Sequence, residues 1–325
     1  MSGATVFIHK SQFPDAVRRE LVRSLRARRI NHKFHYESAK QAQRWLAVHE
    51  AHSPARTDQQ CLRTYDVAFN SVSAQISTER IRVIGLGCGG GQKDVRLLEL
   101  LARRGKKLAY APCDVSVPLV LVARNNTLKI IDEAAIRPLV CDLALTKQFD
   151  ALIPSEGGEQ RLITFFGMIP NFEPRVILPK LAQIVRRGDW LLFSANLVPA
   201  PDEEASMRRI LPQYDNELTR EWLLTLLLDL GVERDDGAVQ FMIETVPGRI
   251  AVKRFIARFH FHRSRSLQLD GEAFNFRRGE EIQLFFSYRY TPRTVEQLLK
   301  KYSLRLRDSW ATDSGEEGIF LCRRG

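Results

Sequence analysis

The sequence predicts an α/β protein with a mostly parallel central sheet and a smaller α+β lobe inserted late in the chain. From about residue 80 to residue 198, short apolar runs alternate with helical segments at the spacing of βαβ units. Residues 199–287 break this alternation, with one helical stretch followed by long alternating strands. With 325 residues, of which 44% are hydrophobic, the chain is long enough to bury a core in each of two lobes.

The parallel sheet is expected to contain five strands, joined by helices whose ends carry stop or start signals. Gly105 and Gly188 follow the first and third helical segments, and Ser116 precedes the second. Strands connected in this way form a parallel sheet with helices on both faces. The predicted strands are 82–86, 108–113, 137–141, 162–166 and 190–195, and the predicted helices are 93–104, 117–124 and 175–187.

Later segments predict a hairpin and a second lobe. The turn Asp313-Ser-Gly315 favours an antiparallel hairpin on the edge of the sheet. The predicted elements are a helix at 294–302 and hairpin strands at 304–312 and 318–323, and in the inserted lobe a helix at 217–230 and strands at 238–245, 250–262 and 280–290.

A glycine-rich turn follows the first predicted strand and indicates a ligand site. The stretch that contains Gly87 and Gly89 lets the backbone turn tightly into a helix, and brings main-chain N–H groups against a ligand that a Cβ would exclude. Asp114 ends the next strand, where a carboxylate can accept hydrogen bonds from both hydroxyls of a ribose. These residues predict a cofactor that contains a nucleoside.

Elimination favours S-adenosylmethionine (SAM) among such cofactors. A dinucleotide site needs a third glycine where this chain has Gln92, and a P-loop needs a spacing and a hydroxyl that are missing here. SAM has no phosphate and needs only the close backbone approach and the acid for its ribose. A glycine-rich turn in another kind of α/β protein remains the alternative. We expect residues 59–198 plus 288–325 to bind SAM, and residues 1–58 plus 199–287 to bind the substrate.

Composition restricts the compartment and the partners. Five cysteines without paired spacing favour a reducing cytoplasm over a disulfide framework or a zinc site, so no metal is expected. The absence of a long apolar run predicts a cytoplasmic chain without a membrane span. The net charge is +11, but the arginines near the N-terminus surround an apolar stripe of Val17, Leu21 and Leu25. This pattern is more typical of a solvated helix face than of a nucleic-acid platform, so nucleic acid is an unlikely partner.

Five motifs give the chain a resemblance to a known family. The predicted strand order resembles that of the Rossmann-like class I methyltransferases. Within them the chain resembles the family of the histidine Nα-methyltransferase of ergothioneine biosynthesis, which includes enzymes that N-methylate dimethylallyltryptophan. This resemblance implies a monomer with its amine substrate held between two lobes. The matching motifs are Gly85-Leu-Gly-Cys-Gly89, Ala111-Pro-Cys-Asp-Val-Ser116, Val140-Cys-Asp142, Gly167-Met-Ile-Pro-Asn-Phe172, and Arg278-Gly-Glu-Glu-Ile with Ser287-Tyr-Arg-Tyr290.

The resemblance implies roles for individual residues. Asp114 would hold the ribose of SAM and Asp142 its adenine amine, while Asn171, Tyr214 and Tyr36 would orient the amine that is methylated. Asp142 could instead cap a loop, Asn171 could end a strand, and the two tyrosines could be packing residues. The implied cofactor residues are Gly87, Cys88, Gly89, Asp114, Val115, Asp142, Leu143 and Phe166, and the implied substrate residues are Tyr36, His52, Asn171, Tyr214, Phe255, Phe285 and Ser287.

Two departures from the family pattern argue against histidine as the substrate. Phe285 stands where the histidine enzymes have a glutamate that binds the imidazole, and phenylalanine cannot accept a hydrogen bond. The family's double-tyrosine Pro-Thr-Arg loop appears here as Ala51-His-Ser-Pro-Ala-Arg56, which puts recognition of an α-carboxylate in doubt. We expect N-methylation of a small aromatic or indole-type amine or amino-acid derivative. An RNA or protein methyltransferase and a SAM-binding scaffold without activity are the alternatives, and O- or C-methylation remains open.

Overall fold

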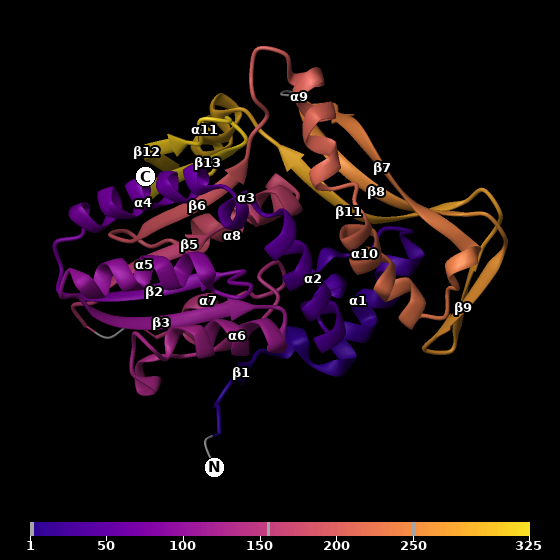
Figure 1. The fold of residues 1–325 in the computed structure, drawn as a ribbon. Coiled ribbons are helices and arrows are strands. Elements are labelled where there is room, and N and C mark those ends of the chain that lie inside the picture. Colours follow the sequence, from indigo (N-terminus) through magenta and orange to yellow (C-terminus); the bar gives the residue numbers. More distant parts are fainter. Residues whose placement is uncertain (1–2, 155–156, 249–250) are drawn as a thin grey trace.

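The computed structural model describes residues 3–154, 157–248 and 251–325, which form a large sheet, a smaller sheet and the helices around them (Figure 1). The large sheet has eight strands in the order β1-β4-β3-β2-β5-β6-β13-β12. These strands are β1 (Phe7–Ile8), β2 (Arg80–Leu86), β3 (Lys107–Asp114), β4 (Leu139–Val140), β5 (Gln160–Phe165), β6 (Trp190–Asn196), β12 (Leu304–Ala311) and β13 (Glu317–Arg324).

The strand directions confirm the predicted α/β architecture. Each neighbouring pair from β1 to β6 is parallel, and the hairpin of β12 and β13 is antiparallel and joins the sheet through β6. The sequence prediction missed β1, because a two-residue strand carries no periodic signal. It also overextended β4, which the structure limits to Leu139–Val140.

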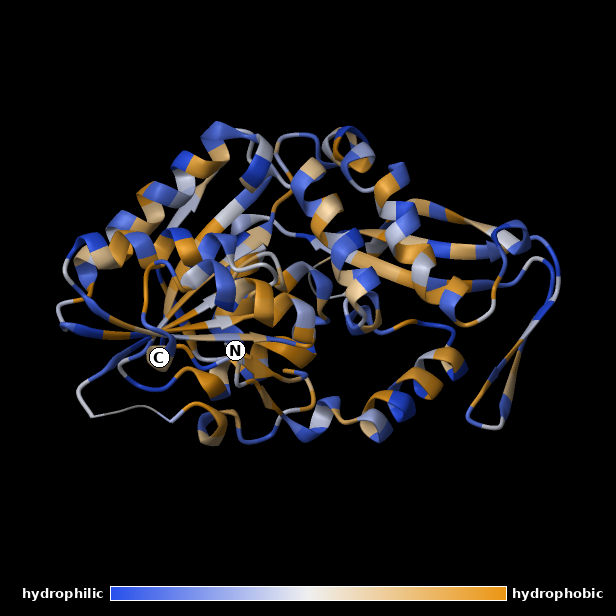
Figure 2. Cartoon of the chain, turned by 60° about the horizontal axis from the view of Figure 1, so that its bottom comes forward, coloured by the Kyte–Doolittle hydropathy of each residue, from blue (hydrophilic) through white to orange (hydrophobic). Residues whose placement is uncertain are grey.

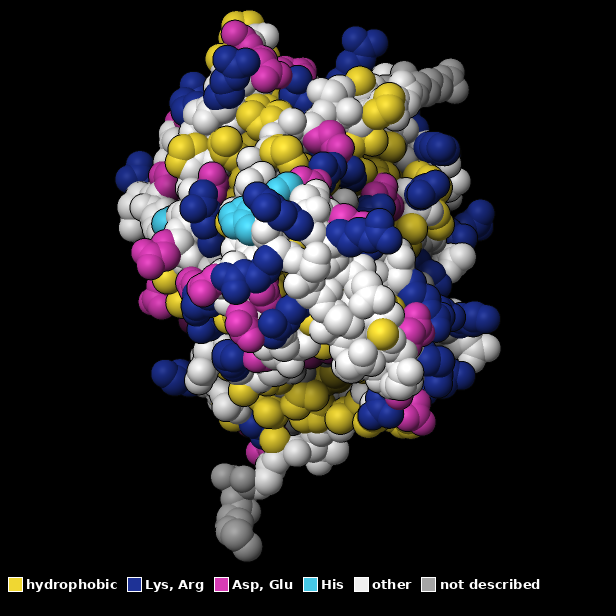
Figure 3. Space-filling view, turned by 90° about the vertical axis from the view of Figure 1, so that its right-hand side faces the viewer, with side chains coloured by type: hydrophobic (Ala, Val, Ile, Leu, Met, Phe, Trp, Pro, Cys, Tyr) yellow, Lys and Arg dark blue, Asp and Glu magenta, His cyan; other side chains and the backbone are white. Residues whose placement is uncertain are grey.

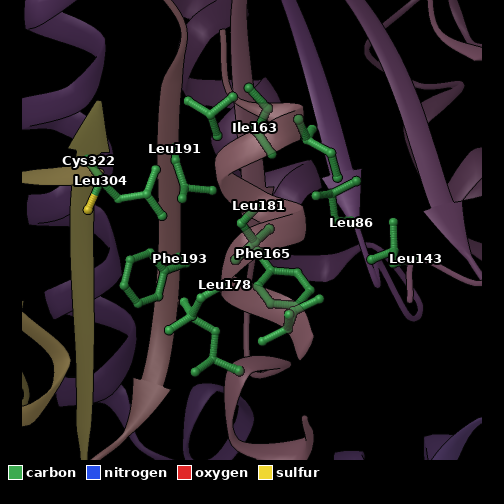
Figure 4. Packing of buried hydrophobic residues seen from close by; sticks show 14 of the residues in the cluster. Leu86, Leu143, Ile163, Phe165, Leu178, Leu181, Leu191, Phe193, Leu304 and Cys322 are labelled. Atoms are coloured by element: carbon green, nitrogen blue, oxygen red, sulfur yellow. The ribbon is translucent and has the colours of Figure 1, made fainter. Parts of the chain in front are cut away.

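Helices cover both faces of the large sheet. On β2, Ile81 and Val83 pack against α4 (Gln59–Gln75) and α5 (Gln92–Arg103), whereas Ile84 and Leu86 point to the opposite face. On that face Leu86 belongs to one apolar cluster with Leu178 and Leu181 of α8 (Pro174–Ile184) (Figure 4), and the cluster extends to Val295 and Leu299 of α11 (Pro292–Lys301). The strands are therefore apolar on both faces, as a covered parallel sheet requires (Figure 2).

A second core lies beside a three-stranded antiparallel sheet in the order β11-β8-β7. Its strands are β7 (Gly237–Val246), β8 (Val252–Phe261) and β11 (Glu281–Arg289). The predicted start of β8 at residue 250 lies outside the described residues. Helices α1 (Pro14–Arg26), α2 (Ala39–His52) and α10 (Glu217–Asp229) contribute to this core, which brings the N-terminal segment onto the inserted segment.

The remaining elements are short, and most of them were not predicted. Strands β9 (Arg265–Leu269) and β10 (Glu272–Phe276) form a separate hairpin beyond β8. The short helices are α3 (Pro54–Thr57), α6 (Val117–Thr127), α7 (Phe149–Leu152) and α9 (Glu203–Ile210), and the 3-10 turns are η1 (Lys10–Gln12), η2 (His32–His35), η3 (Glu133–Ala135), η4 (Ile169–Asn171), η5 (Leu211–Gln213) and η6 (Arg234–Asp236). Among the described residues, no helix has both the length and the apolar character needed to cross a membrane.

The arginines of the N-terminal segment connect it to neighbouring strands. Arg18 pairs with Asp270 at 3.4 Å and Arg26 with Glu272 at 2.5 Å, so α1 is tied to the β9–β10 hairpin. The face at this end of the molecule shows basic and acidic side chains intermixed (Figure 3). Such exposed pairs each contribute about 1 kcal/mol or less. They nevertheless give these arginines carboxylate partners within the chain.

Candidate active site

A cavity of about 590 Å³ opens at the carboxyl ends of the parallel strands, which is where open α/β sheets bind their ligands. It is lined by the turns after β2, β3 and β5, by the N-terminal segment and by β11. All but one of the predicted site residues line it. They are Tyr36, His52, Gly87, Cys88, Gly89, Asp114, Val115, Asp142, Leu143, Phe166, Asn171, Tyr214, Phe285 and Ser287.

Phe255 is the exception, and its prediction as a substrate residue is corrected. This residue of β8 is fully buried and does not line the cavity. Its ring lies 4.5 Å from the ring of Tyr214, centroid to centroid. Phe255 is the register partner of Ser287 and lies on the same face of the sheet, but the ring of Tyr214 covers it.

The glycine turn and Asp114 form one hydrogen-bonded unit. Gly87 and Gly89 have φ values of +58° and +53°, a region that side chains other than glycine rarely adopt. A Cβ on Gly89 would lie 2.6 Å from Cη2 of Trp45. Asp114 Oδ2 accepts from the Gly89 N–H at 3.0 Å and Oδ1 accepts from the Ser116 N–H at 3.1 Å. The turn thus holds the carboxylate in place, and the missing Cβ lets Trp45 approach the backbone of Gly89 closely.

Burial sets the protonation of this acid. It raises the pKa of Asp114 to about 6, although backbone hydrogen bonds to Gly89 and Ser116 oppose the shift. The carboxylate is therefore mostly ionised at neutral pH and able to accept from the two hydroxyls of a ribose.

Asp94 is a second buried acid in the cavity, and sequence reasoning missed it. It lies in the first turn of α5 and accepts hydrogen bonds from Tyr110 Oη and Thr164 Oγ1, both at 2.7 Å. A Cβ on Gly85 would lie 2.1 Å from its Oδ2, so only glycine leaves space for this network. Burial raises the pKa of Asp94 to about 6. We infer that Asp94 stabilises the conformation of the glycine turn.

Lys93 is a cation of the cavity that was also missed. Its Nζ donates to Tyr65 Oη at 2.6 Å and to Glu317 Oε1 at 3.1 Å. Burial alone would raise the pKa of Glu317, but Lys93 and Tyr65 lower it below its usual value. The sequence did contain a signal for this residue, because Lys93 follows Gly91, the last glycine of the turn, by two residues. A cation at that position could bind the carboxylate of a ligand.

Asp142 and Leu143 occupy the loop after β4. Asp142 Oδ1 accepts from the Ala144 N–H at 2.9 Å, so the side chain does cap its own loop. Its Oδ2 lies 3.3 Å from Lys33 Nζ. Ser11 Oγ accepts from the Asp142 N–H at 3.0 Å. Two contacts from the N-terminal segment therefore fix this acid from outside the sheet.

The opposite wall of the cavity is aromatic. Tyr36 packs on Trp45 and Trp222 with ring centroids at 5.7 and 5.4 Å. Phe285 stacks on His32 at 4.8 Å and meets Trp222 edge-on at 5.9 Å. Burial lowers the pKa of His32 well below its usual value, so this imidazole is neutral near pH 7.

Polar side chains interrupt this wall. Tyr214 Oη is 3.2 Å from Ser287 Oγ, and Asn196 Nδ2 donates to Tyr214 Oη at 2.9 Å. Asn171 belongs to η4 at the end of β5, and its side-chain amide makes no hydrogen bond with the described part of the chain. His52, at the end of α2, also faces the cavity. The cavity thus combines a glycine-and-acid half with an aromatic half that contains a few polar groups.

The fold and this site define a class I SAM-dependent methyltransferase. Its signature is a mostly parallel sheet in which β13 inserts antiparallel between β6 and β12, with the glycine turn and the ribose acid at the ends of β2 and β3. A family model described as "Histidine-specific methyltransferase, SAM-dependent" matches residues 15–324. The chain belongs to this family, and SAM is its cofactor.

Several solved methyltransferase structures are similar to this chain at low identity. The magnesium protoporphyrin IX methyltransferase from Synechocystis PCC 6803 is 13% identical, with 88% of this chain and 95% of that chain covered and a TM-score of 0.47. The 1,6-didemethyltoxoflavin-N1-methyltransferase from Burkholderia thailandensis is 9% identical, with 87% and 86% covered and a TM-score of 0.45. The mitomycin 7-O-methyltransferase is 15% identical, with 97% and 70% covered and a TM-score of 0.44. These values are too low to say anything about the substrate of this chain. No curated protein sequence matches it.

Proposed function

We propose that this protein N-methylates a small aromatic amine or amino-acid derivative other than histidine. The observation that carries the proposal is the aromatic half of the cavity, in which Phe285 is stacked on His32 and lies beside Trp222. A planar ring gains buried area and edge or face contacts there. An imidazole would find no carboxylate at Phe285 to accept from its ring N–H.

The residues of the first half fit SAM. Gly87 and Gly89 line the cavity with bare backbone in a tight turn, Asp114 offers a carboxylate to a ribose, and Lys93 offers a cation to the amino-acid carboxylate. Asp142 would accept from the adenine amine, next to Leu143. Cys88, Val115 and Phe166 would complete the walls. When bound, SAM supplies an electrophilic methyl group on a sulfonium.

The protein's contribution to the reaction is orientation. The side-chain amide of Asn171 has no hydrogen-bond partner among the described residues and would hold the substrate amine, while Tyr36 and Tyr214 would confine it from two sides. Holding the nitrogen lone pair in line with the methyl carbon provides most of the gain in such a transfer. The amine attacks as the free base, so an ammonium substrate must lose one proton before the bond to carbon forms. As the N–C bond forms, the C–S bond breaks and S-adenosylhomocysteine leaves, and the N-methylammonium product can then give a second proton to solvent.

The two parts of the chain have separate tasks in this proposal. Residues 59–198 plus 288–325 bind SAM, and residues 1–58 plus 199–287 bind the substrate within a monomer. Strand β1 is a contribution of the N-terminal segment to the large sheet, where it pairs with β4. The RNA or protein alternative gains no support from α1, because Arg18 and Arg26 have carboxylate partners.

Methyl transfer to a panel of amines tests the proposal. The panel contains histidine, phenylethylamine, tyramine, tryptamine and the amino acids from which these amines derive. Mass spectrometry should detect an N-methyl product for at least one aromatic amine, with S-adenosylhomocysteine formed in equal amount, and a much slower reaction with histidine. Histidine as the best substrate, or methylation of RNA alone, would overturn the proposal.

A further inference from the structure

Arg289 is a buried cation on the wall of the cavity, and no carboxylate in the described part of the chain pairs with it. Its side chain is only 4% exposed. Other buried arginines in the described part of the chain are ion-paired, Arg82 with Glu159 and Arg161 with Asp150. Arg289 has no carboxylate within 4 Å among the described residues. Burying a charge without a counter-ion is costly, so its surroundings must compensate.

Neutral groups provide that compensation in part. Arg289 Nη1 donates to the carbonyl oxygens of Leu197 and Glu316 at 2.9 and 3.0 Å, and Nη2 donates to Tyr214 Oη at 3.2 Å. The guanidinium lies 5.5 Å from the ring centroid of Tyr214. Its Nε is buried and donates to no described residue. The full positive charge therefore remains beside the cavity.

The hydrogen bonds around Tyr214 leave one hydroxyl proton without an acceptor. Tyr214 Oη accepts from Asn196 at 2.9 Å and from Arg289 at 3.2 Å, which occupies its two lone pairs. Its own proton can go to Ser287 Oγ, at 3.2 Å, or into the cavity. If it goes to Ser287, the proton of Ser287 has no acceptor in the described part of the chain. In either case, one O–H is available to a ligand.

We infer that the substrate carries an oxyanion, received by Tyr214 and Ser287 in front of Arg289. Asn196, Tyr214, Ser287 and Arg289 all line the cavity, and together they offer a donor and an uncompensated positive charge. A carboxylate satisfies both, because hydrogen bonds between charged partners are stronger than neutral ones. The carboxylate can be borne by the ring or by the carbon next to the amine. This inference rests on the proposed function and restricts its substrates to anionic aromatic amines.

Matched ligand pairs test the inference on the intact protein. Calorimetry in the presence of S-adenosylhomocysteine compares phenylethylamine with phenylalanine for the α-carboxylate, and with 4-(2-aminoethyl)benzoate for the ring-borne carboxylate. One carboxylated member should bind at least about tenfold more tightly than phenylethylamine. Equal affinities in both pairs would overturn the inference, and this comparison needs no variant.

Variants of Arg289 test whether its guanidinium recognises the carboxylate of the ligand. Arg289→Met should abolish the preference for the carboxylated ligand, so its affinity for that ligand should fall by a larger factor than its affinity for phenylethylamine. Arg289→Lys should restore part of the preference, which a merely structural role would not produce. Arg44→Met is the matched control, because Arg44 pairs with Glu221 at 3.0 Å outside the cavity. A preference that survives in Arg289→Met would contradict the assignment.

Benzoate separates this inference from the proposed function. It carries the carboxylate without an amine and cannot be N-methylated. If no amine in the panel accepts a methyl group but benzoate still binds the wild type and not Arg289→Met, the proposed function fails and the oxyanion site stands. If amines are methylated but benzoate does not bind and the matched pairs are equal, the oxyanion site fails alone.

Discussion

Lys33 Nζ lies 3.3 Å from Asp142 Oδ2, and both side chains are almost completely buried. The pair joins η2 to the loop after β4, and therefore joins the segment that carries Tyr36 to the loop proposed to bind adenine. Lys33 Nζ makes no hydrogen bond to any other described residue. This buried ion pair is therefore one of the contacts that join the substrate wall to the cofactor site, beside the hydrogen bond from the Asp142 N–H to Ser11 Oγ.

Removing the cation of this pair should destabilise the protein. Lys33→Met leaves the Asp142 carboxylate buried without its partner, and we expect the free energy of unfolding to fall by about 3 kcal/mol in urea titrations. Adding Asp142→Asn should recover part of the loss. Lys40→Met is the control, because Lys40 and its partner Asp229 are 52% and 43% exposed, and it should cost less than about 1 kcal/mol. An equal decrease in the free energy of unfolding in Lys33→Met and Lys40→Met would show that the buried pair stabilises the protein no more than the exposed pair does.

A side chain in the glycine turn should weaken the binding of SAM. In Gly89→Ala the new Cβ meets Trp45 at 2.6 Å and the backbone keeps a φ of +53°. We expect at least about a tenfold loss of affinity for S-adenosylhomocysteine in calorimetry. Gly105→Ala matches the backbone strain, with a φ of +73°, but has nothing within 4 Å of its Cβ. It should lose about 1 kcal/mol of stability and keep its affinity. Normal affinity in Gly89→Ala would argue against the turn as the cofactor site.

The affinity for SAM should fall in mild acid. Asp114 has its pKa raised to about 6 by burial, so the carboxyl gains a proton below that pH and loses its capacity to accept from two ribose hydroxyls. Calorimetry between pH 5 and 8 should show weaker binding below about pH 6. Asp114→Asn should bind weakly throughout and show no such step. Asp94 also has a pKa of about 6, so Asp94→Asn must keep the step if Asp114 causes it.

The same shift fixes the direction of the stability effect. Because the folded protein holds the proton of Asp114 more tightly than the unfolded chain, this residue favours the folded state at low pH. Its contribution to stability should fall as the pH rises from about 4 to about 6. Urea titrations of the wild type and of Asp114→Asn across this range should differ in slope with that sign.

A carboxylate at position 285 should change the substrate ranking. Phe285→Glu places an acceptor beside His32 and Trp222 in the aromatic half, and should raise the rate with imidazoles relative to carbocyclic amines. Phe285→Leu keeps the site apolar and should leave the ranking unchanged. Competition assays that mix histidine with an aromatic amine measure the ratio directly. If Phe285→Glu and the wild type rank the amines alike, the pocket has been assigned to the wrong residues.

The sequence predicted those parts of the fold that depend on local hydrophobic periodicity and on residues that end or begin helices and strands. Strand β2 and helix α5 were predicted because an apolar run ends in glycines and an amphipathic helix begins after them. Strand β1 was missed because it exists only through its pairing with β4. The β9–β10 hairpin turns at Asp270-Gly271, both with positive φ, which is a signal that the sequence did contain.

The candidate site divides in the same way. Gly87 and Asp114 could be found because they stand where two predicted strands end, whereas Tyr214 was implied only by the resemblance to a known family. Phe255 lies on the same face of the sheet as Ser287, but the ring of Tyr214 separates it from the cavity, and strand alternation does not predict such a tertiary contact. The roles of Lys33 and Arg289 depend on contacts with residues more than 70 positions away in the sequence. Lys33 pairs with Asp142, and Arg289 donates to Tyr214. Such pairings arise from the tertiary fold and leave no local pattern.

Calorimetric titration with S-adenosylhomocysteine tests the central claim most directly, namely that the glycine turn and Asp114 together hold the cofactor. We predict one site per chain in the wild type, and at least about a tenfold weaker affinity in Asp114→Asn at pH 7.5. No heat of binding in a folded wild type, or an unchanged affinity in Asp114→Asn, would contradict the account.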